Sequence, residues 1–233
     1  MRTKVTMTWK DAQNHPHFIR LSEGNSKLEP NKQTRFLIWS LPIIKTCPYA
    51  TEHCKAKCYG AGAYQRYGGN KSNAWLSDIR HLELSSCEGF VDNMVWTINQ
   101  YMNRPSYRNA ESVVFRIHER GDFYSPQYMH AWYMIARRIK HIYGNKIQFI
   151  AYTKSVPYLV EIPELMDVVN VRFSVWDDTL PAHIGMAELL NMPIYTAVDK
   201  FDTWNGAKCR CTDCATCGMC WNMGIDKIAC EIH

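Results

Sequence analysis

Cysteines are the residues with the clearest chemical potential in this 233-residue sequence. Nine of its ten cysteines fall into two clusters, and the tenth, Cys87, stands alone. The first cluster comprises Cys47, Cys54 and Cys58, and the second lies between positions 209 and 230. Thiols that are spaced a few residues apart can converge on one soft metal centre. The sequence therefore predicts a metalloprotein.

The second cluster favours iron–sulfur chemistry over zinc. From Cys211 to Cys220, successive cysteines are separated by two residues. This spacing resembles the bacterial ferredoxin run, in which consecutive thiolates wrap one cluster. A zinc ribbon instead places a long spacer between two Cys-x-x-Cys pairs. We predict five metal ligands here, keep zinc as the alternative metal, and regard Cys230 and His233 as additional candidates; the five are Cys209, Cys211, Cys214, Cys217 and Cys220.

The first cluster places three thiols within a short segment, at Cys47, Cys54 and Cys58. Three thiolates can hold three irons of a four-iron cluster and leave the fourth iron open for a substrate or cofactor. His53 is a competing ligand, although a lone histidine in a loop is more often a solvent-exposed side chain. We predict that Cys87 is a buried thiol on a helix and binds no metal.

The elements that must position these cysteines alternate between strands and helices. Helical periodicity indicates helices over 73–85, 88–103 and 125–143. Several of the predicted strands are apolar on both faces, which is typical of a parallel sheet covered by helices. Five strands are too few for a closed eight-stranded barrel, so we predict a partial parallel (β/α) barrel. Apolar runs predict these strands over 35–42, 112–119, 146–153, 168–176 and 193–198.

The chain divides into three predicted parts. Residues 1–34 are polar and irregular, and residues 35–198 form the partial barrel. Residues 199–233 form a Cys-rich tail with too few apolar residues to fold without a metal.

Polar residues follow each of the five predicted strands. In parallel α/β folds, functional residues gather at the carboxyl ends of the strands. We therefore expect these sets to share one rim, although a solvated loop is the favoured interpretation for Asp178 and Lys200. The sets are the first cysteine cluster, His118 to Asp122, Tyr152 to Lys154, Trp176 to Asp178, and Asp199 with Lys200.

Composition and charge argue against several classes of protein. No apolar run approaches the roughly 18 residues that span a bilayer, and residues 1–13 lack the apolar core of a secretion signal. We expect a cytoplasmic protein, where thiols stay reduced, so a disulfide scaffold is the weaker hypothesis. The formal net charge of +5 is spread out rather than gathered in a dense Lys/Arg stripe. It permits nucleic-acid binding without arguing for it.

Several motifs resemble those of the phage gene product 88 family. The resemblance runs from about Gly24 to Trp221, and the combination of motifs is specific. It implies a small, phage-encoded protein that acts in the host cytoplasm. The motifs are Gly24-Asn-Ser-Lys-Leu28, Trp39-Ser-Leu-Pro42, Thr46-Cys47-Pro48, Cys54-x-x-x-Cys58-Tyr59, Arg116-x-His118-x-x-Gly121-Asp122-Phe123, Tyr152-Thr153-Lys154 and the Cys-rich end.

More distantly, the sequence resembles the radical S-adenosylmethionine (SAM) enzymes. Those enzymes carry a Cys-x-x-x-Cys-x-aromatic-Cys loop after the first strand of a partial barrel, and Cys54-x-x-x-Cys58 is similar. Ala61 stands where their third cysteine belongs, so Cys47 would substitute for it. The resemblance implies reductive cleavage of SAM, with cofactor-binding residues Tyr59, Glu119, Gly121 and Asp122 and with Lys154 or Asp177 near the substrate.

Three functional hypotheses are open at this point. The leading one is an iron–sulfur protein of radical-SAM-like architecture, with one or two four-iron clusters and SAM-dependent or redox chemistry on an unknown substrate. In that hypothesis the tail cysteines hold a second cluster or close the first. The second is a zinc-stabilised module that binds nucleic acid or a phage protein. The third is an iron–sulfur protein with a structural or electron-transfer role.

Overall fold

The computed structural model describes residues 7–66, 72–210, 212–221 and 224–232. Its centre is an all-parallel sheet of seven strands that curls into a half-barrel, which confirms the predicted fold class. The strand order is β1-β2-β3-β4-β5-β7-β6. The strands are β1 (Thr34–Trp39), β2 (Ser112–Ile117), β3 (Ile147–Thr153), β4 (Asn170–Val175), β5 (Ile194–Val198), β6 (Ala207–Lys208) and β7 (Lys227–Glu231).

Helices fill the connections between these strands. The longer ones, which cover the sheet, are α4 (Asn73–Ser85), α5 (Phe90–Met102) and α7 (Pro126–Tyr143). The shorter ones are α1 (Trp9–Gln13), α2 (Glu52–Ala56), α3 (Tyr59–Arg66), α6 (Pro105–Arg108), α8 (Val156–Glu161), α9 (Leu165–Val168), α10 (Pro181–Leu189) and α11 (Cys214–Cys217). The 3₁₀ turns among the described residues are η2 (Gly144–Lys146), η3 (Phe201–Thr203) and η4 (Met219–Trp221).

The helix α7 illustrates how local sequence sets these boundaries. The Ser125 side chain accepts a hydrogen bond from the Tyr128 amide at 3.2 Å, and Pro126 occupies the first turn. Both features are favoured where a helix begins. The helix ends at Gly144, whose φ of +57° suits a residue without a Cβ. Its apolar stripe includes Trp132 and Ile135 and is fully buried, so each such side chain contributes about 1.5–3 kcal/mol.

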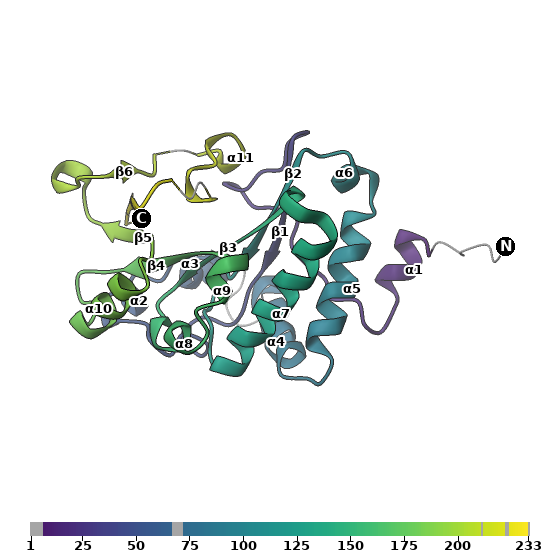
Figure 1. Ribbon diagram of the computed structural model, residues 1–233, viewed down its shortest axis with the longest axis horizontal. Coiled ribbons are helices and arrows are strands. Elements are labelled where there is room, and N and C mark those ends of the chain that lie inside the picture. Colours follow the sequence, from purple (N-terminus) through teal and green to yellow (C-terminus); the bar gives the residue numbers. More distant parts are fainter. Residues whose placement is uncertain (1–6, 67–71, 211, 222–223, 233) are drawn as a thin grey trace.

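The two faces of the sheet have different partners because successive strand residues point to opposite sides. One face, called here the helix face, carries Phe115 and Phe149, which pair in register and pack in the same core as α5 and α7. The opposite face, called here the tail face, carries Phe36, Val114 and Ile150, which pack with Trp221 and other residues of the Cys-rich segment. In Figure 1 this yellow segment and α11 lie on one side of the sheet, with α5, α7 and α8 on the other.

Two strands come from the segment predicted to be a metal-binding tail. The strand β7 pairs with β5 on one side and with β6 on the other. Its Ile228 and Ala229 are completely buried. The segment that carries the second group of cysteines therefore also extends the sheet of the half-barrel, through β6 and β7.

Candidate functional site: two thiol groups on the half-barrel

The carboxyl ends of the strands form a rim that is ordered by a buried carboxylate. Asp122 lies in the loop after β2 and accepts hydrogen bonds from the Thr153 hydroxyl at 2.6 Å and the Lys154 amide at 2.8 Å. Its own amide donates to the Thr46 carbonyl at 3.2 Å. Asp122 thus joins the loops that follow β1, β2 and β3, through its backbone amide to the first loop and its carboxylate to the third. Burial raises the pKa of Asp122, while its hydrogen bonds lower it.

Three thiols meet at this rim. Cys54 lies in α2, where the Thr51 hydroxyl accepts a hydrogen bond from its amide at 3.2 Å, and Cys58 directly precedes α3. Burial raises the pKa of Cys47 to about 12, and the nearby Asp122, Cys54 and Cys58 add to the rise. Cys47, Cys54 and Cys58 are therefore electrostatic neighbours, and we call them the rim thiols.

Lys154 reaches the rim thiols from the end of β3. Burial raises the pKa of Cys54, but the charge of Lys154 and its hydrogen bond to this thiol oppose the rise. The same ammonium donates to the Ser174 hydroxyl at 2.8 Å and lies 5.8 Å from the centre of the Trp176 ring. The radical SAM resemblance implies that Lys154 or Asp177 lies near the substrate, and in the structure Lys154 lies beside Cys54.

Asp177, the second residue predicted to lie near substrate, belongs to a separate exposed group. His53 Nδ1 lies 2.7 Å from Asp177 Oδ1, and the His53 amide donates to Asp178 at 2.9 Å. The hydrogen bond to Asp177 raises the pKa of His53. Ligand atoms of these three residues lie within 4.8 Å of one another, but their exposure and mutual pairing account for the arrangement. Asp178 is half-buried through this contact.

The residues predicted to bind a cofactor are engaged mainly within the protein. The Glu119 carboxylate accepts hydrogen bonds from Asn25 and, at 2.7 Å, from Arg120. Gly121 has a φ of +81°, and a Cβ there would lie 2.6 Å from the Leu41 Cβ. It therefore permits a close backbone approach. Tyr59 begins α3 with about half of its surface exposed.

A second group of thiols lies over the tail face. Burial raises the pKa of Cys214 to about 11, and the neighbouring Cys220, Cys209 and Cys217 also act on it, while Arg116 opposes part of the rise. Cys230, on β7, is a further neighbour of Cys209. We call Cys209, Cys214, Cys217, Cys220 and Cys230 the tail thiols. Cys211, also predicted to be a ligand, lies outside the described residues.

Buried cations and hydroxyls surround the tail thiols. Arg172, completely buried on β4, donates to the Cys220 carbonyl at 2.6 Å and to the Ile225 carbonyl at 2.7 Å. The Tyr152 hydroxyl lies beside the Cys220 thiol and the Tyr195 hydroxyl beside the Cys230 thiol, and each hydroxyl lowers the pKa of its neighbouring thiol against the rise caused by burial. The tail thiols thus have surroundings different from those of the rim thiols, whose neighbours are Asp122 and Lys154.

The spacing of the thiols bears on the metal they suit. In the part of the chain that the structure describes, only His53, Asp177 and Asp178 bring three ligand atoms within 4.8 Å of one another. Thiolates on one tetrahedral zinc ion, with zinc–sulfur distances of about 2.3 Å, lie only about 3.8 Å apart. In neither group do three of the described thiols lie within 4.8 Å of one another. All nine described cysteines are free of disulfides.

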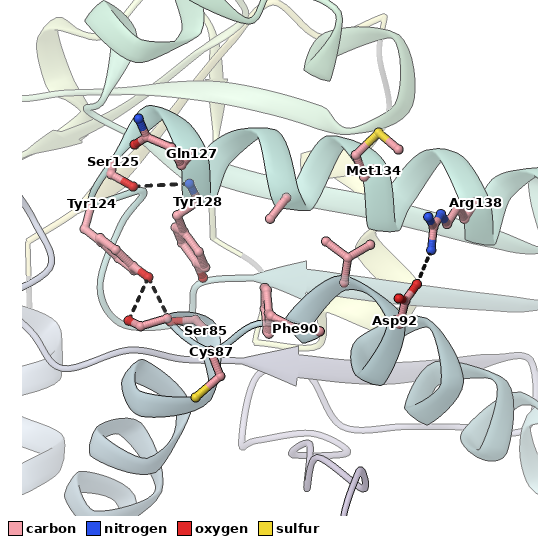
Figure 2. Close-up of a pocket in the computed structure, with 14 residues that line it drawn as sticks. Ser85, Cys87, Phe90, Asp92, Tyr124, Ser125, Gln127, Tyr128, Met134 and Arg138 are labelled. Carbon is pink, nitrogen blue, oxygen red and sulfur yellow. Dashed lines mark hydrogen bonds and ion pairs between the residues drawn. The ribbon is translucent and has the colours of Figure 1, made fainter.

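A pocket of about 520 Å³ lies among the helices that cover the helix face, between the end of α4, α5 and α7 (Figure 2). The Arg138–Asp92 ion pair closes one end, and Tyr124 contacts Ser85 at the other. Cys87 lines this pocket and is exposed. The prediction of a buried Cys87 is wrong, because α4 ends at Ser85 and leaves this thiol beyond the helix.

The fold and its two thiol groups define a Cys-rich α/β half-barrel protein. Comparison of the sequence then identifies the family: the chain belongs to the gene product 88 family, whose sequence model matches residues 19–223. This confirms the family resemblance found in the sequence motifs.

Two relatives carry the name Gene 88 protein. The one from Mycobacterium phage L5 is 31% identical over 139 residues, which cover 58% of this chain and 54% of that protein. The one from Mycobacterium phage D29 is 24% identical over 205 residues, covering 76% of this chain and 78% of that protein. The match to the L5 protein thus spans about half of its length. The chain is a member of a phage protein family.

Among solved structures, the GH26 β-mannanase BoMan26A of Bacteroides ovatus is similar, with 13% identity and a TM-score of 0.31 over 66% of this chain and 50% of that chain. This likeness is too weak to bear on the present fold. Among the described residues, no helix combines the length and the apolar character needed to cross a membrane.

Proposed function

We propose that this chain is a phage iron–sulfur protein in which Cys47, Cys54 and Cys58 hold a four-iron cluster with one iron open to a small-molecule ligand. The single observation that carries the proposal is that the loop bearing the three rim thiols and the loop bearing Lys154 are joined at Asp122, which sets Lys154 beside Cys54. Three thiolates from one short segment satisfy three irons and leave the fourth without a protein thiolate.

The surroundings of the rim thiols fit such a cluster. Metal binding requires deprotonated thiols, and the Lys154 ammonium favours the thiolate of Cys54. Asp122 fixes the loops on which the thiols depend, because it joins the segments after three strands. The rim thiols are also spaced more widely than the ligands of one zinc ion. These residues bind, orient and shield the cluster, which would supply electron transfer or ligand activation.

The radical SAM resemblance suggests SAM as the ligand of the open iron. Glu119 and Asp122 bear the nearby carboxylates, and both are committed to hydrogen bonds with protein groups. SAM would thus bind at a rim whose carboxylates are already held in place by the protein. The exposed Tyr59, at the start of α3, is an aromatic side chain that the ligand could contact. We keep SAM as the proposed ligand and an enzyme of the SAM-dependent class as the proposed activity.

Anaerobic purification of matched variants tests the rim cluster. Cys54→Ser should lose the iron and acid-labile sulfide that the rim holds, because it removes the thiol that Lys154 contacts. Cys87→Ser is the control: its thiol is exposed and lines the pocket between α4, α5 and α7, so iron and sulfide should stay at the wild-type level.

Equal iron content in wild type and Cys54→Ser, or stoichiometric zinc without sulfide, would refute the rim cluster. In the same preparations, the electron-paramagnetic-resonance spectrum of reduced wild type should change when SAM is added. A spectrum that is indifferent to SAM would leave the cluster in place and exclude SAM as its ligand.

A further inference from the structure

We propose that Cys230, together with Cys209, Cys214 and Cys220, holds a second iron–sulfur cluster on the tail face, separate from the rim thiols. This centre goes beyond the function proposed above and does not depend on it. It also adds β7 to the ligand-bearing segments, so the ligands are not simply the run of closely spaced cysteines.

Backbone contacts bring the four thiols together from distant positions. The Cys209 amide donates to the Ala229 carbonyl at 2.7 Å, which sets Cys209 beside the residue that precedes Cys230. The Cys214 amide donates to the Lys27 carbonyl at 2.9 Å and thereby anchors α11 to the segment before β1. The Cys220 carbonyl accepts a hydrogen bond from the buried Arg172. The segments that bear Cys209, Cys214 and Cys220 are thus held by β7, by the chain before β1 and by β4, respectively.

The thiols themselves are mutual electrostatic neighbours. Cys209 is the common member, since it acts on Cys214, Cys220 and Cys230. Cys220 also acts on Cys214. Cys217 is a neighbour of Cys214. The arrangement centres on Cys209 rather than on the middle of the cysteine run.

The side chains around the four thiols suit an anionic centre. Hydroxyls lie beside two of the proposed ligands, Tyr152 beside Cys220 and Tyr195 beside Cys230. Arg116 and Arg172 are neighbours of Cys220 and favour its thiolate. Arg116 also has a fully buried Nε without a hydrogen-bond partner in the described structure, although its guanidinium lies 5.2 Å from the Tyr152 ring centre. Hydrogen bonds to ligand sulfurs and nearby cations stabilise iron–sulfur clusters.

The floor of this site is apolar. Cys214 and Cys220 pack against a small core on the tail face, which is distinct from the large core under the helices. Such a floor keeps water away from the sulfurs and lowers the local dielectric constant. The members of this small core are Leu28, Phe36, Ile38, Val114 and Ile150.

Ligand number and spacing define the class of metal centre. Four cysteine thiolates close all four irons of a four-iron cluster, so no iron is left for a substrate. The wide spacing of the described thiols argues against one zinc ion. A closed cluster mainly transfers electrons or braces the fold, in contrast to the open cluster proposed at the rim.

The test isolates the tail centre by removing the rim ligands. The variant Cys47→Ser/Cys54→Ser/Cys58→Ser should keep about half of the wild-type iron and sulfide if each centre holds one four-iron cluster. Adding Cys230→Ser to this variant should remove the remaining iron. Adding the matched change Cys217→Ser should leave it in place.

Three outcomes would overturn the proposal. Complete loss of iron from the triple variant would mean that the tail thiols only close the rim cluster. Loss with Cys217→Ser but not with Cys230→Ser would assign the ligands to the sequential run. Zinc in place of iron and sulfide would replace the iron–sulfur cluster by a zinc site.

A milder variant guards against misfolding. Tyr195→Phe removes the hydroxyl that lies beside Cys230 and leaves every thiol in place. It should shift the reduction potential of the tail cluster to a more negative value, because hydrogen bonds to ligand sulfur stabilise the reduced cluster. Tyr133→Phe, on α7, is the control and should leave the potential unchanged. Equal potentials in the two variants would contradict Cys230 as a ligand.

Discussion

Gly121 shows how one residue sets the geometry of the rim. Its φ of +81° lies in the left-handed region, and an added Cβ would lie 2.6 Å from the Leu41 Cβ and 2.7 Å from the Thr46 hydroxyl. The next residue, Asp122, depends on this tight turn to reach Thr153 and the Lys154 amide. The backbone of Gly121 therefore determines whether the rim carboxylate can join its loops.

Gly121→Ala should lower the free energy of unfolding by about 1–3 kcal/mol, since it adds backbone strain and steric overlap. Gly62→Ala is the matched control, because the space around its Cβ position in α3 is open. That change should be neutral or slightly stabilising. Urea unfolding of both variants measures the difference, and equal stabilities would show that the rim relaxes around the new methyl group.

At the residue level, the sequence identified the thiols and the polar residues at the strand ends, because residue type and position after an apolar run reveal both. It did not reveal the pairing of His53 with Asp177 or of Glu119 with Asn25, since those contacts join loops that lie far apart in the chain. Periodicity carries no information about such contacts. Cys230 was noted only as an additional candidate, although its place in a short alternating run before Glu231 fits a strand.

Among the elements, the tail is the one whose structure differs most from the sequence pattern. The five predicted strands correspond to β1–β5, because their apolar runs are long and sharply bounded. Neither β6 nor β7 was predicted, since β6 has two residues and β7 exposes Lys227. Their pairing depends on β5, a long-range contact that local propensity does not encode.

Arg172 ties the tail to the sheet. Arg172→Lys keeps the charge but cannot reach both the Cys220 and Ile225 carbonyls, so the tail should lose about 2 kcal/mol of local stability. Limited proteolysis should then cleave between residues 209 and 225 several times faster than in wild type. Arg137→Lys, an exposed change on α7, should cleave at the wild-type rate. Identical rates in the two variants would show that other contacts hold the tail.

For the whole molecule, His118 links stability to pH. Burial, followed by the charge of Arg116, lowers the pKa of this histidine to about 3, against 6.5 for an exposed one. Between pH 6.5 and pH 3, His118 therefore binds a proton in the unfolded chain but stays neutral in the folded chain. The free energy of unfolding therefore keeps the full contribution of the neutral His118 above pH 6.5 and loses it as the pH falls from 6.5 towards 3.

His118→Asn removes this titration while keeping a side chain that tolerates the positive φ of 63° at this position. The stability difference between wild type and variant should shrink by about 1.4 kcal/mol for each pH unit below 6.5. Denaturant titrations at pH values from about 6 to about 4 measure it. His130→Asn, an exposed change on α7, should follow the wild-type profile, and a parallel profile for His118→Asn would contradict a buried neutral His118.

The strand order has a consequence for how the protein is made. The strand β6 precedes β7 in the chain, yet β7 lies between β5 and β6 in the sheet. During translation, β6 and the thiols after it leave the ribosome before the strand that receives them, and such non-local parallel pairing forms slowly. Those thiols spend that interval open to oxidation. If Cys230 is a ligand, as proposed above, pairing of β7 with β5 and β6 also brings the last ligand to the cluster site. The cluster would then bind only at the end of folding.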